Sequence, residues 1–535
     1  MKKIFYTVVA ATLFSCGDSL DQDPIGKLTG KDFPKTDADA ISAVNGIYQA
    51  AELSTRFGYT IDLPSDLTST GENPNGDAGF LSSQQWEPGN SYITYMWETF
   101  YAGITNANVL IDALESPESK ITPSLSTRLI GEAKFLRAYY YQYAVQFWGD
   151  VPVILHRGVN DEGASLTRAP IDSVYKQIEQ DLKDAATLLP RATAYSGTDR
   201  GRASWGAAKA LLSKVYLIWG QTSPTFTPVE QKDAYDKSIA LATEVIGSGD
   251  YQLETEYRRN WSVENRNGIE SIFATQHSLS QSSDGGGGNH LLHCAFSTGF
   301  TQTLPHVVVS NIKFRNEFNP DDQRKGVTYA DSIYNPLKQE WYQFDVPRYS
   351  KYIDPLDPNG SASNRNLDRT VLRFAEVYLL RAEALNESNN APAGTAIEDF
   401  NVVRRRAFQL PLNQLSATYD FPADIRPAGF RDTGGTYTSD YEGFKVAIQQ
   451  ERTFELTYEQ NRRLDLLRWK ILVKALKASG VPAKDYVSLR NYRFPIPKSQ
   501  REINPTQLWQ NWGFDGYDEA KTGANPYASW ELPKK

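Results

Sequence analysis

The sequence predicts an all-α protein built from stacked helix pairs, together with an irregular, loop-rich lobe that contains a few short strands. Apolar residues recur at helical spacing through most of residues 36–250 and again beyond residue 366, which is typical of helices that bury one face. Between these regions the periodicity fades, and Gly, Asn, Asp and Ser become frequent, as they do in loops. Apolar residues make up 40% of the 535 positions, which is enough for a large core.

The first residues are typical of an export signal. Two lysines precede the apolar run Ile4–Phe14, which is too short to cross a bilayer. The run ends in LFSC, a pattern that resembles the bacterial lipobox, so residues 1–15 are predicted to be a signal peptide and Cys16 the site of lipidation. A chance cysteine in an ordinary signal peptide is the alternative. Residues 16–30 are expected to form a tether, because they are polar and include Pro24.

Six helices are expected in the first half of the chain. The first begins at a T-x-x-D capping pattern, and a proline opens and closes the fourth. The helices are predicted at residues 36–53, 92–114, 126–150, 170–190, 204–220 and 234–247. Alanines at positions 207, 208 and 210 would let the last two helices approach closely, as in a tetratricopeptide-like hairpin. Such hairpins stack into an α-α superhelix, and an ordinary helical bundle is the alternative.

The second half of the chain alternates loops with helices. The segment IESIFATQHS, residues 269–278, is predicted to be a short strand inside the loop-rich lobe at 251–365, which is expected to lie mostly outside the helical body. Helices are expected again at 370–387, 393–408 and 441–476, the last as one long helix or two consecutive ones. The Pro- and Asn-rich tail at 491–517 is expected to lie extended over the body.

Composition and motifs exclude several classes of function. The net charge is −8 and no basic block is present, so nucleic acid is not expected as a partner. Two cysteines are too few for a disulfide framework. The sequence contains no G-x-S-x-G, H-E-x-x-H or P-loop pattern, and the protein is therefore predicted not to be an enzyme. A helical glycoside hydrolase is an alternative, because its chemistry needs only two suitably spaced carboxylates.

Two clusters of polar residues could carry chemistry. Glu451, Glu455 and Glu459 are spaced four apart, with arginines nearby at positions 452, 462, 463 and 468. This pattern favours an ion-pair network over acid/base catalysis. The H-x-x-H-C pattern at residues 290–294 lies in a glycine-rich loop, and no second cluster completes a zinc site. We therefore expect no metal and no cofactor.

Four stretches of the chain resemble one protein family. CGDSLDQDP, RFAEVYLLRAEALNE with AIEDFNVVRRRA, ERTFELTYEQNRRLDLLRW and FPIPKSQREINPTQLWQN are together similar to SusD/RagB-type lipoproteins of the Bacteroidetes outer membrane. Within the third stretch, Gln460 stands where the family usually has glycine. The resemblance implies a lipid-anchored protein that faces the cell surface at the outer membrane. It further implies that the protein captures glycans for polysaccharide utilisation and delivers them to a SusC-like TonB-dependent transporter.

The resemblance also implies a domain organisation. A helical region at 31–250 would include a first ligand loop at 55–92, the lobe would occupy 251–365, and a second helical region with the extended tail would occupy 366–535. In such proteins the first loop and the lobe together form the binding surface. We therefore expect ligand contacts in these two zones.

Aromatic and polar residues in the two zones are the candidate ligand contacts. A flat ring matches the apolar face of a sugar, while Asn, Asp and Arg side chains match its hydroxyl rim. The candidates are Arg56, Tyr59, Asp66, Trp86, Asn90, Trp341 and Tyr342. Trp86 and Trp341 are expected to clamp one ligand if the fold brings their loops together. A peptide ligand, or a scaffold that binds no ligand, is the alternative.

Overall fold

The structure is a computed structural model that describes most of the chain. The described residues are 33–51, 55–70, 75–156, 166–277, 309–335, 339–352, 367–430, 436–522 and 525–530. The predicted signal peptide, the lipidation site Cys16 and the tether lie outside the described residues, as do His290, His293 and Cys294. In the described part of the chain, no helix combines the length and the apolar character needed to cross a membrane.

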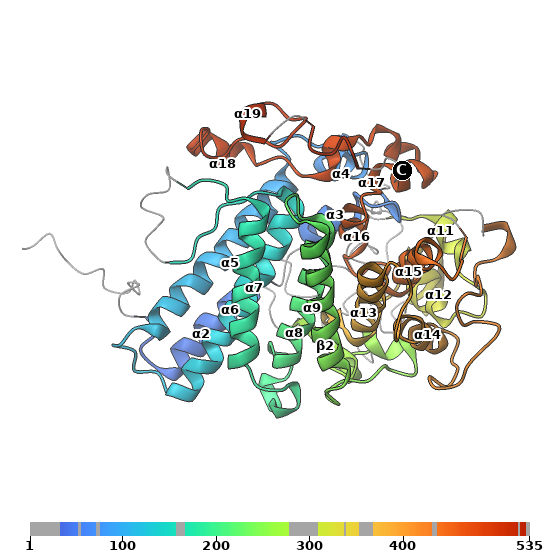
Figure 1. Ribbon diagram of the computed structural model, residues 1–535, viewed down its shortest axis with the longest axis horizontal. Coiled ribbons are helices and arrows are strands. Elements are labelled where there is room, and N and C mark those ends of the chain that lie inside the picture. Colours follow the sequence, from blue (N-terminus) through green and yellow to red (C-terminus); the bar gives the residue numbers. More distant parts are fainter. Residues whose placement is uncertain are drawn as a thin grey trace, which may run out of the picture.

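Long helices form a continuous row that makes up the body of the molecule (Figure 1). The row consists of α5 (Ser91–Glu115), α6 (Pro123–Trp148), α7 (Ile171–Leu188), α8 (Trp205–Thr222), α9 (Pro228–Ile246) and α13 (Phe374–Asn389), and each helix packs against the next. Helix α2 (Asp37–Ala51) covers α5 and α6, while α14 (Ala396–Ala407) and α15 (Tyr441–Leu456) pack against α13. The predicted stack of helix pairs, with the helix beyond residue 370 joined to the N-terminal ones, is confirmed.

Local sequence explains where these helices begin and how closely they pack. The Asn90 side chain accepts hydrogen bonds from the backbone amides of Tyr92 and Ile93 in the first turn of α5. Thr227 and Glu230 form a capping box at the start of α9. Gly103 of α5 faces the Tyr140 ring so closely that an added Cβ would lie 2.4 Å from a ring carbon. The absence of a side chain at this position therefore allows α5 and α6 to approach each other.

The described residues form three antiparallel two-stranded sheets, and two of them connect the lobe to the rest of the chain. Strand β1 (Thr68–Ser69) pairs with β3 (Val309–Ser310), β2 (Ser271–Thr275) pairs with β6 (Arg369–Arg373), and β4 (Tyr329–Asn335) pairs with β5 (Glu340–Tyr349). The strand predicted at 269–278 is confirmed as β2. The helix predicted from residue 370 begins only at Phe374, because the preceding residues pair with β2 as β6.

The stretch 441–476 forms three helices, and not the one or two predicted. After α15 the chain continues as α16 (Arg462–Arg468) and α17 (Leu472–Ala478). Tyr458, Gln460 and Lys470 adopt positive φ angles of 63°, 55° and 60° at the breaks. A left-handed conformation is incompatible with a continuing right-handed helix, so the chain turns at these residues.

The remaining elements are short. They are α3 (Thr55–Asp62), α4 (Asp77–Ser82), α11 (Ile312–Glu317), α12 (Gln323–Thr328), α18 (Lys498–Ile503) and α19 (Glu519–Thr522), with the 3₁₀ helices η2 (Ala192–Ala194), η3 (Gly197–Asp199), η4 (Tyr257–Trp261), η5 (Val263–Asn265), η6 (Ala428–Phe430), η7 (Pro482–Tyr486) and η8 (Leu489–Tyr492). The tail with α18 and α19 crosses one end of the row of helices (Figure 1). It is fastened there because the Phe494 amide donates to the Phe147 carbonyl at 2.8 Å.

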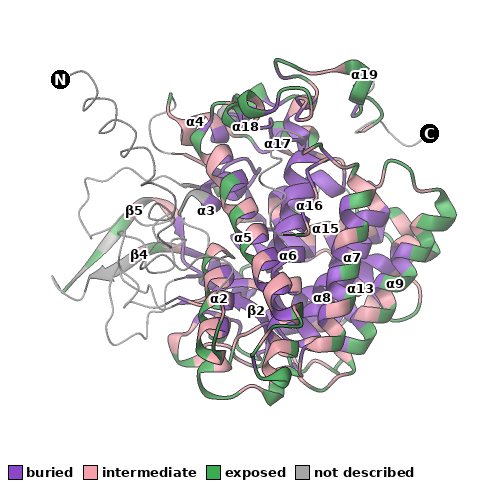
Figure 2. Cartoon of the chain, turned by 90° about the vertical axis from the view of Figure 1, so that its left-hand side faces the viewer, coloured by how far each residue is buried: buried purple, intermediate pink, exposed green. Residues whose placement is uncertain are grey.

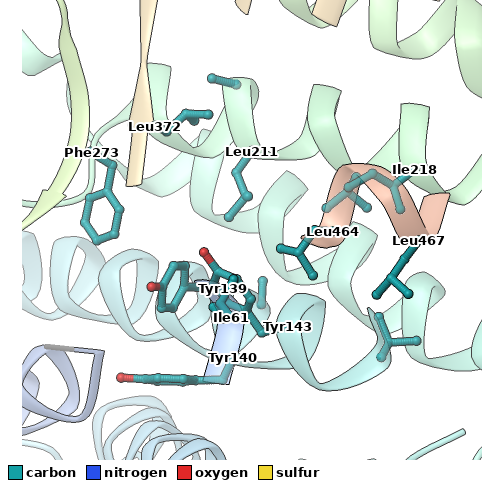
Figure 3. Packing of buried hydrophobic residues seen from close by; sticks show 14 of the residues in the cluster. Ile61, Tyr139, Tyr140, Tyr143, Leu211, Ile218, Phe273, Leu372, Leu464 and Leu467 are labelled. Atoms are coloured by element: carbon teal, nitrogen blue, oxygen red, sulfur yellow. The ribbon is translucent and has the colours of Figure 1, made fainter. Parts of the chain in front are cut away.

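The core lies where the helical body meets α3, α16 and the β2–β6 sheet. Figure 3 shows the α6 tyrosines Tyr139, Tyr140 and Tyr143 beside Ile61, with Leu211 and Leu464 nearby. All six side chains are buried. The core thus fixes α3, which forms the first part of the predicted ligand loop at 55–92.

Candidate functional site

The structure joins the two aperiodic zones that the sequence predicts to bind a ligand. The Leu67 carbonyl of the first loop accepts hydrogen bonds from the Asn311 amide at 2.7 Å and from the Tyr349 hydroxyl at 2.7 Å. Strands β1 and β3 pair at the same place. The first loop and the lobe therefore meet, although more than 200 residues separate them in the sequence.

Three of the predicted ligand contacts in the first loop already have partners inside the protein. Arg462 donates to the Asp66 carboxylate from two nitrogens, at 2.6 and 2.8 Å. Asn90 caps α5 through its side-chain oxygen. The Tyr59 ring is only 8% exposed and packs edge-on against Tyr92. These side chains stabilise the loop, and their rings and polar atoms are engaged in doing so.

Trp86 lies in the core, which corrects the expectation of a ring that stacks on a ligand. Its side chain is fully buried, with 0% of its surface exposed. The Phe494 ring packs edge-on at 5.2 Å between centroids, and the Arg463 guanidinium lies 5.1 Å from the indole centroid. The C-terminal tail therefore covers the indole, and the predicted clamp between Trp86 and Trp341 is wrong.

Trp341 is the exposed aromatic residue among the predicted contacts that the structure describes. It lies on β5 opposite Tyr334, and 64% of its surface is exposed. Strands β4 and β5 form a hairpin that projects beside the helical body (Figure 2). Tyr334 is five residues from Tyr329, which pairs with Tyr349 at the base, so Trp341 lies roughly 17 Å from the base of the hairpin. The side chains of Arg56 and Tyr342 lie outside the described part, so their predicted roles stay predictions.

Polar side chains accompany Trp341 on the hairpin. Gln343 is exposed two residues further along β5, and alternation along a strand puts it on the same face as Trp341. Gln339 is exposed at the turn, where its φ angle is 55°. A flat ring beside amide donors and acceptors can bind a ligand that has an apolar face and a hydroxyl rim.

The base of the hairpin is firmly packed. The Tyr349 ring stacks on Tyr458 at 4.3 Å between centroids with an angle of 9° between the planes. The Ser350 amide donates to the Thr328 carbonyl at 2.8 Å, which continues the β4–β5 pairing toward α12. Since the base is buried and the far end exposed, the hairpin presents Trp341 from a fixed support.

The three glutamates spaced four apart form a buried ion-pair network, as predicted. Arg324 of α12 donates to Glu451 at 2.6 Å and to Glu455 at 3.0 Å. Arg373, at the end of β6, donates to Glu459 at 2.9 Å and also contacts Glu455. All five side chains are almost fully buried. The network therefore ties the lobe, the β2–β6 sheet and α15 together.

The partners in this network differ from those that the sequence indicates. The arginines near the glutamates in sequence pair elsewhere: Arg452 and Arg468 bind Asp465, at 3.1 and 2.8 Å, while Arg462 binds Asp66. Burial alone would raise the pKa of the Glu455 carboxyl. The guanidinium groups of Arg406, Arg373 and Arg324 nevertheless hold this pKa well below its usual range. A carboxylate held in this way is unsuited to act as a general acid.

Gln460, just before α16, connects α3 to β6. Its amide nitrogen donates to the Asp62 carboxylate at 3.2 Å, and its oxygen accepts from Arg369 at 3.4 Å. Gln460 adopts a φ angle of 55°, a conformation that glycine adopts more readily. The side chain thus forms a bridge that a glycine at this position would lack. Burial raises the pKa of Asp62 to about 7, even though Gln460 and Arg369 favour the charged form.

We expect the Asp62→Asn variant to be more stable than the wild type at pH 8 but not at pH 5. Below about pH 4 the carboxyl is protonated in both the folded and the unfolded state, whereas above about pH 7 the folded protein must bury its charge. The contribution of Asp62 to stability is therefore lost as the pH rises through about 7, and asparagine retains an oxygen for Gln460. A gain of about 1–3 kcal/mol at pH 8 is expected in denaturant unfolding.

Asp485→Asn is the matched control, because this carboxylate is exposed. It should leave the free energy of unfolding close to that of the wild type at both pH values. Equal effects of the two substitutions at both pH values would contradict the role assigned to Asp62.

Comparison with known proteins identifies the family. The family model described as "Starch-binding associating with outer membrane" matches residues 36–217, and the model described as "SusD family" matches residues 256–517. The chain belongs to the SusD/RagB family. SusD-like protein P25 from Formosa agariphila is 26% identical over 96% of this chain and 99% of its own length. The starch-binding protein SusD from Bacteroides thetaiotaomicron is 24% identical over 76% of this chain and 84% of its own length.

Solved structures of SusD-like proteins share the fold. A SusD homologue from Bacteroides thetaiotaomicron superposes with a TM-score of 0.76 at 23% identity, covering 90% of this chain and 98% of that one. A laminarin-binding SusD-like protein superposes with a TM-score of 0.68 at 25% identity, covering 90% of this chain and 100% of that one. The family resemblance and the fold class predicted from the sequence are thus confirmed.

Proposed function

We propose that this SusD-family protein is a glycan-binding lipoprotein on the cell surface that delivers its ligand to a partner TonB-dependent transporter in the outer membrane. The observation that carries the proposal is the exposed Trp341 ring beside Gln339 and Gln343 on a supported hairpin. Burying roughly 50 Å² of apolar surface against one sugar ring contributes ~1 kcal/mol. One or two such contacts, with hydrogen bonds to the amides, correspond to affinities of about millimolar to micromolar.

Two relatives support a glycan as the ligand. One is a starch-binding protein, and the other is a laminarin-binding SusD-like protein. We assign ligand contacts to the lobe at 251–365, with Trp341 and Tyr342 as candidates, and to Arg56 in the first loop. The helical regions at 31–250 and 366–535 then offer a separate face for the transporter.

The engaged carboxylates support binding without catalysis. Glu451, Glu455 and Glu459 each accept hydrogen bonds from buried arginines or Lys351, at 2.6 to 3.0 Å for Glu451 and 2.8 to 3.0 Å for Glu459. A glycoside hydrolase needs one carboxyl that holds a proton near neutral pH and a second that faces the substrate. These three glutamates supply neither, so they argue against the hydrolase alternative.

A binding screen tests the proposal and separates glycan from peptide. The purified protein is run through native gels that contain laminarin, starch or xylan, and a pool of oligopeptides is titrated by calorimetry. We expect at least one polysaccharide to retard the protein, the peptides to give no heat of binding, and no reducing ends to accumulate. Binding of peptides alone would favour the peptide-binding alternative, and reducing ends that increase with protein concentration would favour the hydrolase.

Cys16→Ala is expected to release the protein from membranes. The lipobox-like pattern places the lipid on this residue, and stable anchoring requires more than one acyl chain. Fractionation of cells that produce each form should find the wild type in the outer-membrane fraction and the variant in the soluble fraction. A variant that stays in the membrane fraction, or a mature N-terminus other than Cys16, would contradict the assignment.

A further inference from the structure

A polar cleft lies between the 3₁₀ turns η4–η5 and the β2–β6 sheet. It is a shallow cleft that opens to solvent, with about 30 Å³ accessible to a water-sized molecule. The lining residues that carry the argument are Ser262, Arg266, Asn267, Ser271, Asp368 and Thr370. Their side chains are hydroxyls, amides and one ion pair, and no aromatic ring belongs to the described lining.

Hydrogen bonds within the protein hold the walls of the cleft in place. Arg266 donates to both oxygens of Asp368, at 2.6 and 3.1 Å. Asn267 and Gln276 exchange two hydrogen bonds between their amides, at 2.8 and 3.1 Å. A ligand that enters the cleft therefore does not have to order these side chains, which lowers the entropy cost of binding.

Three hydroxyl groups face the cleft with their hydrogen-bonding capacity unused. In the part of the chain that the structure describes, the side-chain oxygens of Ser262, Ser271 and Thr370 have no protein partner. Each hydroxyl can donate one hydrogen bond and accept two. Their positions in a prearranged polar cleft thus match a ligand that presents several hydroxyl groups of its own.

The charges in the cleft are balanced, which decides the charge of the ligand. Arg266 is paired with Asp368 at 2.6 Å. Arg373, at the floor, is paired with Glu270 at 2.7 Å and with Glu459 at 2.9 Å, and it also contacts Glu455. Among the described residues that line the cleft, a phosphate or carboxylate would find no uncompensated cation, and a metal ion would find no uncompensated carboxylate. The ligand that fits is neutral.

We infer that this cleft is a second carbohydrate site, which holds the hydroxyl edge of one sugar ring. The hairpin offers a flat ring to the apolar face of a sugar, whereas the cleft offers only hydrogen bonds, so the two sites bind different sides of a sugar. A shallow site of this kind has an affinity of about millimolar or weaker. Its ligand class follows from the cleft alone and does not depend on the hairpin.

Hydrogen–deuterium exchange of the full chain carrying Trp341→Ala tests this inference. The substitution removes the Trp341 ring from the hairpin. Protection of the cleft is therefore measured without any contribution from the hairpin, and the result does not depend on whether the hairpin binds a glycan. The probes are laminaribiose, maltose and cellobiose up to about 50 mM, since a contact of this kind is expected at millimolar affinity, with inorganic phosphate for comparison. We expect at least one disaccharide, and not phosphate, to slow exchange in peptides that cover residues 260–276 and 367–373.

A second variant shows whether the hydroxyls make the contact. Adding Ser262→Ala and Thr370→Val should raise the disaccharide concentration for half-maximal protection at least tenfold, while the melting temperature stays the same because neither hydroxyl binds the protein. Thr187→Val, an exposed threonine on α7, is the control and should change nothing. Absence of protection with all three disaccharides, protection by phosphate alone, or protection unaffected by the double substitution would overturn the inference.

Discussion

Glu455→Gln is expected to destabilise the protein by ~3–5 kcal/mol. The carboxylate is fully buried and lies within hydrogen-bonding distance of Arg324, Arg373 and Arg406. Glutamine keeps the shape but removes the charge, which leaves three guanidinium groups in the core with less compensation. Losing one member of a buried ion-pair network is far more destabilising than losing a surface pair. Because the network joins α12, β6, α14 and α15, we expect the whole chain to unfold at lower denaturant concentration.

Denaturant unfolding at pH 7 measures this effect, with Glu502→Gln as the control. Glu502 pairs with Lys498 at 3.8 Å, and both side chains are more than half exposed. The control should change the free energy of unfolding by less than about 0.5 kcal/mol. If the two variants were equally stable, the network would not hold the lobe to the helical body.

The same network predicts the acid sensitivity of the fold. The pKa of Glu455 is held below its usual range in the folded protein, so the folded state binds fewer protons than the unfolded state as the pH falls below about 4.5. The stability that Glu455 contributes is therefore present at neutral pH and is lost progressively in acid.

Trp86→Ala is expected to lower the free energy of unfolding by ~3–5 kcal/mol. The fully buried indole fills the space between Phe494 and Arg463, so truncation leaves a cavity at the contact between the first loop and the C-terminal tail. Trp341→Ala makes the same substitution at a position that is 64% exposed, and its melting temperature should stay close to that of the wild type. Similar melting temperatures for both variants would mean that Trp86 is not part of the core.

Local sequence predicts the helices well, because their signals lie within a few residues of one another. The apolar spacing of α5 to α9 and the β2 strand are visible without knowledge of the fold. The start of α9 is not predicted correctly, because the helix begins at Pro228, after the capping box of Thr227 and Glu230, and not at residue 234. The breaks after α15 are not visible either, since Tyr458, Gln460 and Lys470 are ordinary residues that adopt a left-handed conformation only because tertiary contacts stabilise it.

The candidate site is predictable only in part, for a similar reason. Trp86 and Trp341 both lie in sequence without helical periodicity, and the residues around them are of similar types, so the sequence does not show which of the two is buried. Trp86 is buried because it packs against Phe494, which lies more than 400 positions further along the chain. No local pattern indicates this contact. The arginine partners of Glu451 and Glu455 are likewise distant, so the sequence indicates that the glutamates are paired but not with which residues.

The central claim is that Trp341 on the β4–β5 hairpin contacts the glycan while the first loop stabilises the fold. Calorimetric titration of the wild type and of Trp341→Ala, with the polysaccharide that the screen finds to bind most tightly, tests it most directly. We expect a Kd about tenfold higher for the variant, which corresponds to ~1.4 kcal/mol, with an unchanged melting temperature. An unchanged Kd in the variant would place the glycan elsewhere on the molecule and contradict the account.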